Sequence, residues 1–401
     1  MRVSLAAAHA PTPRDAEGRS ESVARPLLAS GGPRVVLGGE LGDDGLARPI
    51  APAADTLFGP RGACLASPGG PLFVCDTGHH RLLVWTNAPM TDGAPADLLI
   101  GQSDFSREGR NAKGEVGAAT LNVPTGVAAE NGVLAVADAW NHRVLLWHGY
   151  PHTANQPADV VLGQADFAGG QANRGADRPR ADTLNWCYGV ALAQGRLIVA
   201  DTGNRRVLVW GGVPEISGAS ADLVMGQRDF VTRDENAGEG GGPLGMRWPH
   251  GLTASADAIL VSDAGNNRIM AWRRWPTSNG GPCDFVLGQP NIIGLDHNGG
   301  AYYPTARTLS MPYGLTAQGD RVIVADTANS RLVGFDRDAL AIGGRASRLA
   351  GQEDFTRKGD NRWGPPVRDS LCWPYGVAAN GKTLIVADSG NSRVLFWEVA
   401  P

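Results

Sequence analysis

A carboxylate, an amide and a guanidinium recur at fixed spacing in this chain, in five copies of the pattern Asp-x-x-Asn-x-Arg and a sixth with His in place of Asn. Groups of these types could bind an ion or transfer a proton. The aspartates lie 62 or 63 residues apart, at Asp76, Asp138, Asp201, Asp263, Asp326 and Asp388. The other members are Asn141, Asn204, Asn266, Asn329 and Asn391, with Arg81, Arg143, Arg206, Arg268, Arg331 and Arg393. Six equivalent copies cannot all serve one active site, so we interpret the motif as a structural turn.

The first copy departs from the motif, because His79 stands where the other copies have Asn, beside His80. Two neighbouring histidines at a turn could ligate a metal. An exposed substitution in an irregular repeat is the favoured interpretation, and we predict neither a metal site nor a cofactor.

A second set of chemically capable residues differs from copy to copy. Each stands directly before the glycine that opens the first apolar run of a repeat, and the six are Arg61, Thr125, Tyr188, His250, Tyr313 and Tyr375. Several follow a tryptophan closely, namely Trp186, Trp248 or Trp373. An imidazole can act as base or metal ligand, a guanidinium can hold a carboxylate and a phenol can donate a proton. These residues are the ligand-binding candidates.

The elements that position these residues are short strands. In the third repeat, apolar runs at 189–192, 197–200, 207–210 and 223–226 alternate with Gly and Asn turns, a pattern typical of strands. A period of about 62 residues indicates a repeat architecture, and four strands in each of six repeats predict an all-β, six-bladed β-propeller. In that topology the candidate residues converge on one mouth of the central channel.

The two ends of the chain predict how the ring closes. The last repeat stops after its third strand, whereas residues 34–38 match the fourth strand of the other repeats. This N-terminal strand is therefore expected to complete the last blade and to cover its open edge. We predict a disordered tail over residues 1–33, because its polar composition buries little area, and a propeller over residues 34–401.

The chain resembles the NHL-repeat proteins. The resemblance rests on the Pro-x-Gly-Val-Ala starts at 124–128 and 374–378 and on the Val-Ala-Asp-x-x-Asn-x-Arg-Val core, and it extends from about residue 34 to the C-terminus. It implies the propeller fold. The family includes protein-binding and RNA-binding scaffolds, with lyases and hydrolases on related propellers, so the resemblance leaves the function open.

Two functional hypotheses follow. The favoured one is a binding or scaffold module that recognises a protein or a small ligand through the loop-rich face around the channel. The alternative is a small-molecule lyase or hydrolase at the channel mouth, with or without a metal. The chain resembles in this respect the propeller lyases of the peptidyl-α-hydroxyglycine type, which hold zinc with channel histidines. Only one of the six candidate residues here, His250, is a histidine, whereas a catalytic zinc normally needs three protein ligands. A mixed metal site, in which Cys187 or Cys64 joins His250, stays open.

A further repeated feature follows the fourth strand, where Gly-Gln-x-Asp-Phe occurs in four copies with an Asn six residues after each Phe. We interpret these residues as pins that hold long loops onto the blades; the alternative is a repeated surface for a repetitive partner.

Composition limits the partners and the location. A net charge of -4 argues against a broad grip on nucleic acid or on an anionic membrane. The five cysteines show no Cys-x-x-Cys pattern, and no apolar stretch approaches a membrane span. We expect a soluble, cytoplasmic protein whose partner is a protein or a small molecule.

Overall fold

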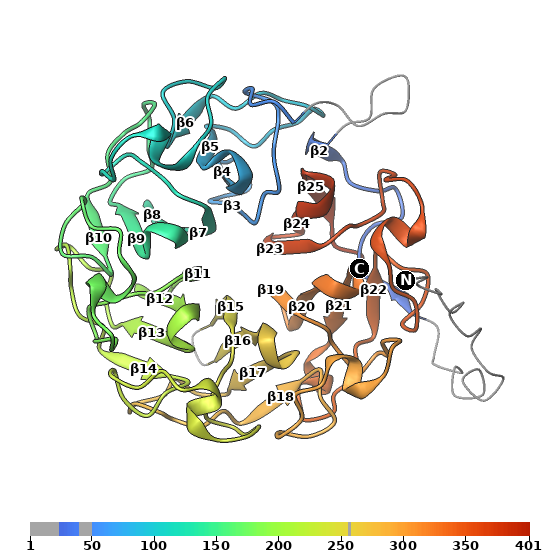
Figure 1. Ribbon diagram of the computed structural model, residues 1–401. Helices are drawn as coiled ribbons and strands as arrows, with labels where there is room; N and C mark the ends of the chain where they lie inside the picture. Colours follow the sequence, from blue (N-terminus) through green and yellow to red (C-terminus); the bar gives the residue numbers. More distant parts are fainter. Residues whose placement is uncertain (1–23, 40–49, 256–257) are drawn as a thin grey trace, which may run out of the picture.

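The chain folds into six sheets arranged like blades around a central channel (Figure 1). Each has four antiparallel strands, and the fifth blade carries a short additional strand at its outer edge. The structure is a computed structural model that describes residues 24–39, 50–255 and 258–401. The innermost strands are β3 (Gly62–Leu65), β7 (Pro124–Glu130), β11 (Cys187–Ala193), β15 (Pro249–Ala254), β19 (Pro312–Gln318) and β23 (Pro374–Asn380). The predicted six-bladed propeller is confirmed.

The remaining strands follow in order outward from the channel. The second strands are β4 (Leu72–Asp76), β8 (Val133–Asp138), β12 (Arg196–Asp201), β16 (Ile259–Asp263), β20 (Arg321–Asp326) and β24 (Thr383–Asp388). The third strands are β5 (Arg81–Trp85), β9 (Arg143–Trp147), β13 (Arg206–Trp210), β17 (Arg268–Trp272), β21 (Arg331–Phe335) and β25 (Arg393–Glu398). The fourth are β6 (Leu98–Ile100), β10 (Val160–Leu162), β14 (Leu223–Met225), β18 (Phe285–Leu287) and β22 (Arg348–Ala350).

The last blade takes its fourth strand from the other end of the chain, as predicted. Strand β2 (Val35–Gly38) pairs antiparallel with β25, with Val36 opposite Leu395. Figure 1 shows this blue strand beside the red one. The pairing covers an edge whose backbone groups would otherwise be open to another chain.

The predicted tail needs a correction at its C-terminal end. Strand β1 (Arg25–Pro26) pairs in parallel with β22, Leu27 is fully buried, and the indole Nε1 of Trp397 donates to the carbonyl of Ala29 at 2.9 Å. Residues 24–33 therefore belong to the propeller and are not a disordered tail. The rest of that prediction, residues 1–23, lies outside the described residues.

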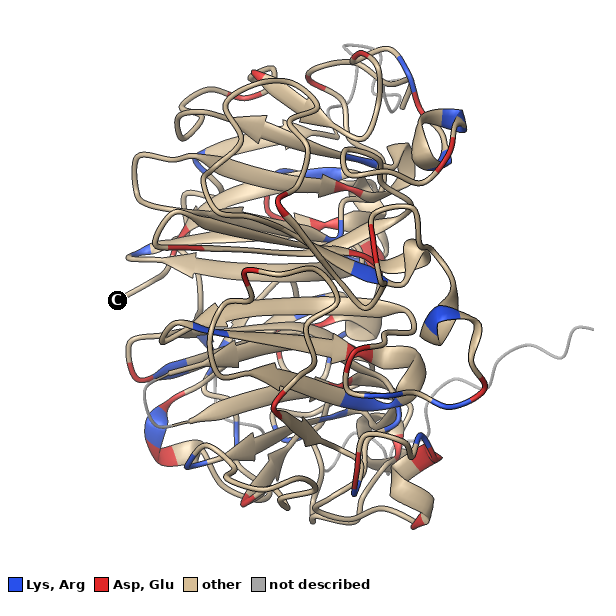
Figure 2. Ribbon diagram, turned by 90° about the vertical axis from the view of Figure 1, so that its left-hand side faces the viewer, with Lys and Arg blue, Asp and Glu red and all other residues tan. Residues whose placement is uncertain are grey.

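The antiparallel order gives the disc two different faces. The turns between second and third strands and the long loops between blades lie on the face where the innermost strands begin, which we call the entry face. The turns between first and second and between third and fourth strands lie on the opposite exit face. Figure 2 shows the disc edge-on, with basic and acidic residues interspersed.

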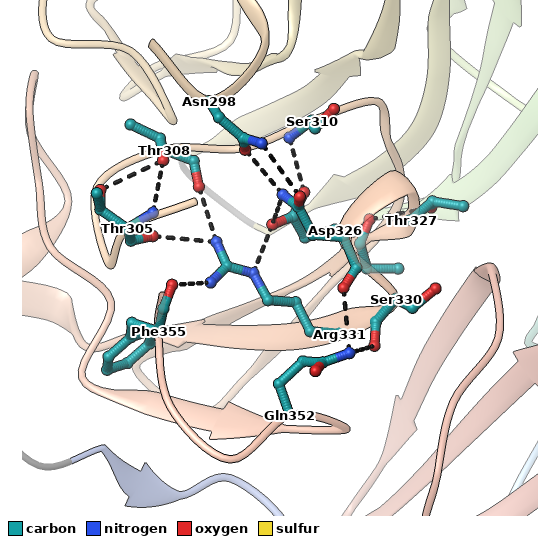
Figure 3. A network of polar contacts seen from close by, with 12 residues as sticks. Asn298, Thr305, Thr308, Ser310, Asp326, Thr327, Ser330, Arg331, Gln352 and Phe355 are labelled. Carbon is teal, nitrogen blue, oxygen red and sulfur yellow. Dashed lines mark hydrogen bonds and ion pairs between the residues drawn. The ribbon is translucent and has the colours of Figure 1, made fainter. Parts of the chain in front are cut away.

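Each Asp-x-x-Asn-x-Arg motif ends a second strand, forms one 3₁₀ turn and starts the third strand. In the fifth blade the turn is η10 (Thr327–Asn329) (Figure 3). Asp326 Oδ2 accepts from Asn329 Nδ2 at 2.8 Å and from Arg331 Nε at 2.7 Å, while its Oδ1 accepts from the Ser310 N–H at 2.7 Å. The other Arg331 nitrogens donate to carbonyls of the inter-blade loops. These contacts suit a structural role.

The same blade shows how the Gly-Gln-x-Asp-Phe loop is held. Gln352 Nε2 donates to the carbonyls of Ser330 at 3.1 Å and Gly359 at 2.8 Å, and the carbonyl of Phe355 accepts from Arg331 at 2.7 Å. The loop therefore closes over the motif arginine. This geometry agrees with the interpretation of these residues as loop pins.

Candidate functional site

The candidate residues are placed by the close approach of neighbouring innermost strands. A Cβ on Gly189 would overlap the carbonyl oxygen of His250, and one on Gly62 would overlap that of Thr125. Glycine is needed at these positions because only it lets the backbones come this close. Each glycine thus packs its blade against the backbone of the candidate residue in the next blade.

Five of the six candidates form one stacked cluster. The ring of His250 lies 4.9 Å from Tyr188 and 4.6 Å from Tyr313, measured between centroids, and Tyr313 lies 4.4 Å from Tyr375. The guanidinium of Arg61 lies over the Tyr375 ring, 5.1 Å from its centroid. Offset aromatic and cation–π contacts of this kind hold the side chains in a defined arrangement.

Thr125, the sixth candidate, faces the neighbouring backbone. It is buried, and its Oγ1 donates to the carbonyl of Tyr188 at 2.8 Å. All six candidates line a channel cavity of about 240 Å³. The five clustered residues also line a wider cavity of about 520 Å³ at the channel mouth on the entry face, but Thr125 does not.

Three tryptophans form the rim of the mouth cavity: Trp186, Trp248 and Trp373. All are exposed, by 48%, 41% and 56%. Trp186 and Trp373 have φ values of 49° and 51°, a region that non-glycine residues seldom occupy. The Trp186 N–H donates to Nδ1 of His142 at 2.9 Å, so the preceding blade helps to hold this conformation.

His250 is neutral at neutral pH. Its Nδ1 lies 3.0 Å from the Trp248 carbonyl, which can only accept, so Nδ1 carries the proton and Nε2 keeps its lone pair. Burial, followed by the charge of Arg61, lowers the pKa of His250 to about 4. Burial also raises the pKa of Tyr313 and of Tyr375. The cluster therefore combines one free imidazole lone pair, neutral phenols and one guanidinium.

The residues around His250 do not match a zinc site. Within the described parts of the chain, no three His, Cys, Asp or Glu side chains are grouped to hold a metal ion. Cys64 lines the channel, but Cys187 points its Sγ at the Arg143 carbonyl, 3.1 Å away. Burial raises the pKa of Cys64 to about 11, so a thiolate ligand is disfavoured there.

The expectation that His79 is exposed is wrong. Its side chain is fully buried, Nδ1 lies 2.8 Å from Asp76 Oδ2 and Nε2 lies 2.6 Å from the Ile50 carbonyl. The imidazole therefore replaces the motif asparagine as a partner of the aspartate. Both ring nitrogens are occupied, which leaves neither for a metal.

Sequence reasoning missed several lining residues of the mouth cavity: Thr202, Arg205 and Ser389. Thr202 and Ser389 belong to the motif turns, and Arg205 follows one of them. Their repeat positions suggested structural roles. The sequence does distinguish Arg205 as a candidate site residue, because His, Asn or Ser occupies its position in the other five copies.

The fold and the mouth define a six-bladed β-propeller with a ligand-sized, aromatic-walled cavity at one end of its channel. The family model for the NHL repeat matches residues 121–145, which contain the second motif copy. NHL repeat-containing protein 2 of Gallus gallus is 24% identical over 366 residues, covering 86% of this chain and 46% of the relative. The chain therefore contains an NHL repeat and is similar over most of its length to an NHL repeat-containing protein.

A second relative is similar over a comparable part of the chain. NHL repeat-containing protein 2 of Homo sapiens is 23% identical over 362 residues, covering 82% of this chain and 45% of the relative. The chain thus spans about half the length of the curated relatives it matches. Among solved structures, the WD40 β-propeller domain of Doa1 has a TM-score of 0.47 at 8% identity and covers 92% of this chain and 96% of its own.

As to membranes, the described residues contain no helix with the length and apolarity needed to cross a bilayer.

Proposed function

We propose that this protein is a binding module that recognises a protein or small-molecule partner through its entry face, around the channel mouth. One observation carries the proposal: every exposed Phe, Tyr and Trp side chain of the described residues belongs to that face. They are Phe58, Trp140, Trp186, Trp248, Tyr302, Tyr303, Trp363 and Trp373. On the exit face, the large exposed apolar side chains of the described chain are Met90, Ile216 and Ile342.

Aromatic side chains exposed together on one face of a soluble domain mark an interaction surface. Trp and Tyr also dominate the energetics of recognition, because they bury a large rigid area when a partner binds. The concave mouth among Trp186, Trp248 and Trp373 adds a pocket in which part of a partner can be enclosed. Charges of both signs are interspersed over the disc, which favours a protein or a small molecule over nucleic acid or an anionic membrane.

Capture of partners with rim variants tests this proposal. The triple variant Trp186→Ser, Trp248→Ser, Trp373→Ser removes the rim, and Met90→Ser, Ile216→Ser, Ile342→Ser is a matched control on the exit face. Molecules that co-purify with the wild-type protein from its native cells should be lost from the rim variant and retained by the control. Loss from the control alone would place recognition on the exit face.

A second candidate function is a lyase or hydrolase at the mouth. The observation in its favour is that His250 lines both cavities. Its Nε2 keeps a lone pair that has no hydrogen-bond partner among the described residues. A neutral imidazole beside phenols can act as a general base. Turnover of a compound captured by the wild type, abolished in His250→Gln while capture persists, would support this function; unchanged turnover in that variant would reject it.

A further inference from the structure

Among the described residues, no counter-charge lies against Arg61 at the channel mouth. Its side chain is half-buried and stacks on Tyr375, yet within the described structure it makes neither a hydrogen bond nor an ion pair. A half-buried guanidinium normally finds a carboxylate or several carbonyls, because its five N–H groups lose water when they are covered. The motif arginine Arg206, by contrast, is bound to Asp201 and to three loop carbonyls.

The wider cavity reinforces this positive charge. Arg205 also lines it, with Nη1 donating to the Arg233 carbonyl at 3.1 Å, while its buried Nε has no partner in the described structure. The described residues that line the channel and mouth cavities include no Asp or Glu. His250 is neutral, so it adds no charge of its own. The mouth therefore offers N–H donors and a positive potential, and no acidic side chain in the described part of the chain satisfies them.

The walls around these donors are flat and apolar. Trp186, Trp248 and Trp373 stand at the rim, and the Tyr188, Tyr313 and Tyr375 rings form the floor with His250. A cavity of about 520 Å³ is within the range of small-ligand sites. Aromatic walls favour a planar apolar group, which stacks against them at little cost in lost conformational freedom.

We infer that the mouth cavity binds an aromatic carboxylate, with the carboxylate on Arg61 and the aromatic ring among the rim tryptophans. The inference rests on the proposed function and names the ligand chemistry of the same face. A carboxylate matches the guanidinium fork, which can donate two parallel hydrogen bonds to its oxygens. Such a ligand is either a free aromatic acid or the C-terminal aromatic residue of a protein partner.

Binding of matched acids and amides tests the inference. The probes are N-acetylphenylalanine and its neutral amide, and a six-residue peptide that ends in Phe with a free or an amidated C-terminus. Affinities are measured by calorimetry for the wild type and for Arg61→Gln, Arg61→Lys and Arg107→Gln. Arg107 is a control because it is an exposed arginine of an entry-face loop that does not line the cavity. Thermal melting checks that each variant is folded.

The wild type should bind each acid at least about tenfold more tightly than its amide, since a charge-assisted pair is stronger than a neutral contact. Arg61→Gln should abolish that preference, Arg61→Lys should reduce it and Arg107→Gln should leave it unchanged. If the peptide acid binds much more tightly than N-acetylphenylalanine, the natural ligand is a protein C-terminus. If the two acids bind with equal affinity, the natural ligand is a free acid.

Two results would overturn the inference. Equal affinity for acid and amide in the wild type would show that Arg61 does not read a carboxylate, and absence of binding of all four probes at millimolar concentration would show that the cavity takes another chemistry. Neither result affects the proposed function, which fails only if partner capture survives loss of the rim tryptophans.

Discussion

The α-carbon of Gly189 lies so close to the carbonyl oxygen of His250 that a Cβ at residue 189 would overlap that oxygen. One blade is thus packed directly against the backbone of the residue at the centre of the aromatic cluster. Packing between blades and the geometry of the candidate site are therefore coupled at this point.

The variant Gly189→Ala should destabilise the protein by about 1–3 kcal/mol, because the added methyl group forces two blades apart. Chemical denaturation measures the free energy of unfolding. Gly212→Ala is the matched control, since a Cβ there meets no atom within 4 Å. Equal stability of the two variants would show that the blades can separate without cost.

Removal of a motif arginine should be more damaging than removal of a surface arginine. Arg206→Ala leaves the fully buried Asp201 without its guanidinium partner and frees three loop carbonyls, so we expect a loss of about 3–5 kcal/mol. Arg107→Ala, in which an exposed ion pair of 3.7 Å is lost, should change the free energy of unfolding by less than about 1 kcal/mol. A small effect in Arg206→Ala would argue against the structural role of the motif.

Truncation tests ring closure. A chain that starts at residue 24 serves as reference, and chains that start at residues 34 and 40 successively remove β1 with Leu27 and then β2. Each step should lower the melting temperature, with the second loss larger because β2 provides a whole edge strand on β25. Identical melting of all three chains would contradict the closure.

The neutral state of His250 predicts a dependence of stability on pH. Burial lowers its folded-state pKa to about 4, whereas an unfolded histidine titrates near 6.5. The unfolded chain therefore binds the extra proton first, so this contribution is complete above about pH 6.5 and is lost as the pH falls towards 4. Between pH 7 and pH 5, His250 should account for a decrease of about 2 kcal/mol in the free energy of unfolding.

Denaturation of His250→Gln at both pH values measures that contribution, which should be absent from the variant. His148→Gln on the exit face is the control. An unchanged pH dependence in His250→Gln would mean that its imidazole is already protonated or is not buried.

The repeat spacing was sufficient to predict the blades. In each copy, Val- and Leu-rich runs stand on both sides of the turn, and they pair as the second and third strands of one blade. The spacing also placed Tyr188, His250 and Tyr313 at one mouth, since equivalent positions in a closed ring face the same channel. Strand β1 was missed because Arg25–Pro26 is too short to show an alternating pattern and pairs in parallel with a distant segment.

The side chains at the site were less predictable than their positions. Thr125 turns to the Tyr188 carbonyl, and His79 is buried against Asp76, because rotamers depend on neighbours from another blade or loop. The sequence likewise shows Arg61 but not that, among the described residues, no acidic side chain reaches it.

The central claim is that recognition takes place on the entry face, around the mouth. Its most direct test is a photo-crosslinking amino acid placed singly at Trp373, 56% exposed on the rim, or at Ile216, 70% exposed on the exit face, in the native cell. After irradiation, the variant at residue 373 should give discrete crosslinked products and the variant at residue 216 should give none above background. Products from residue 216 alone would contradict the account.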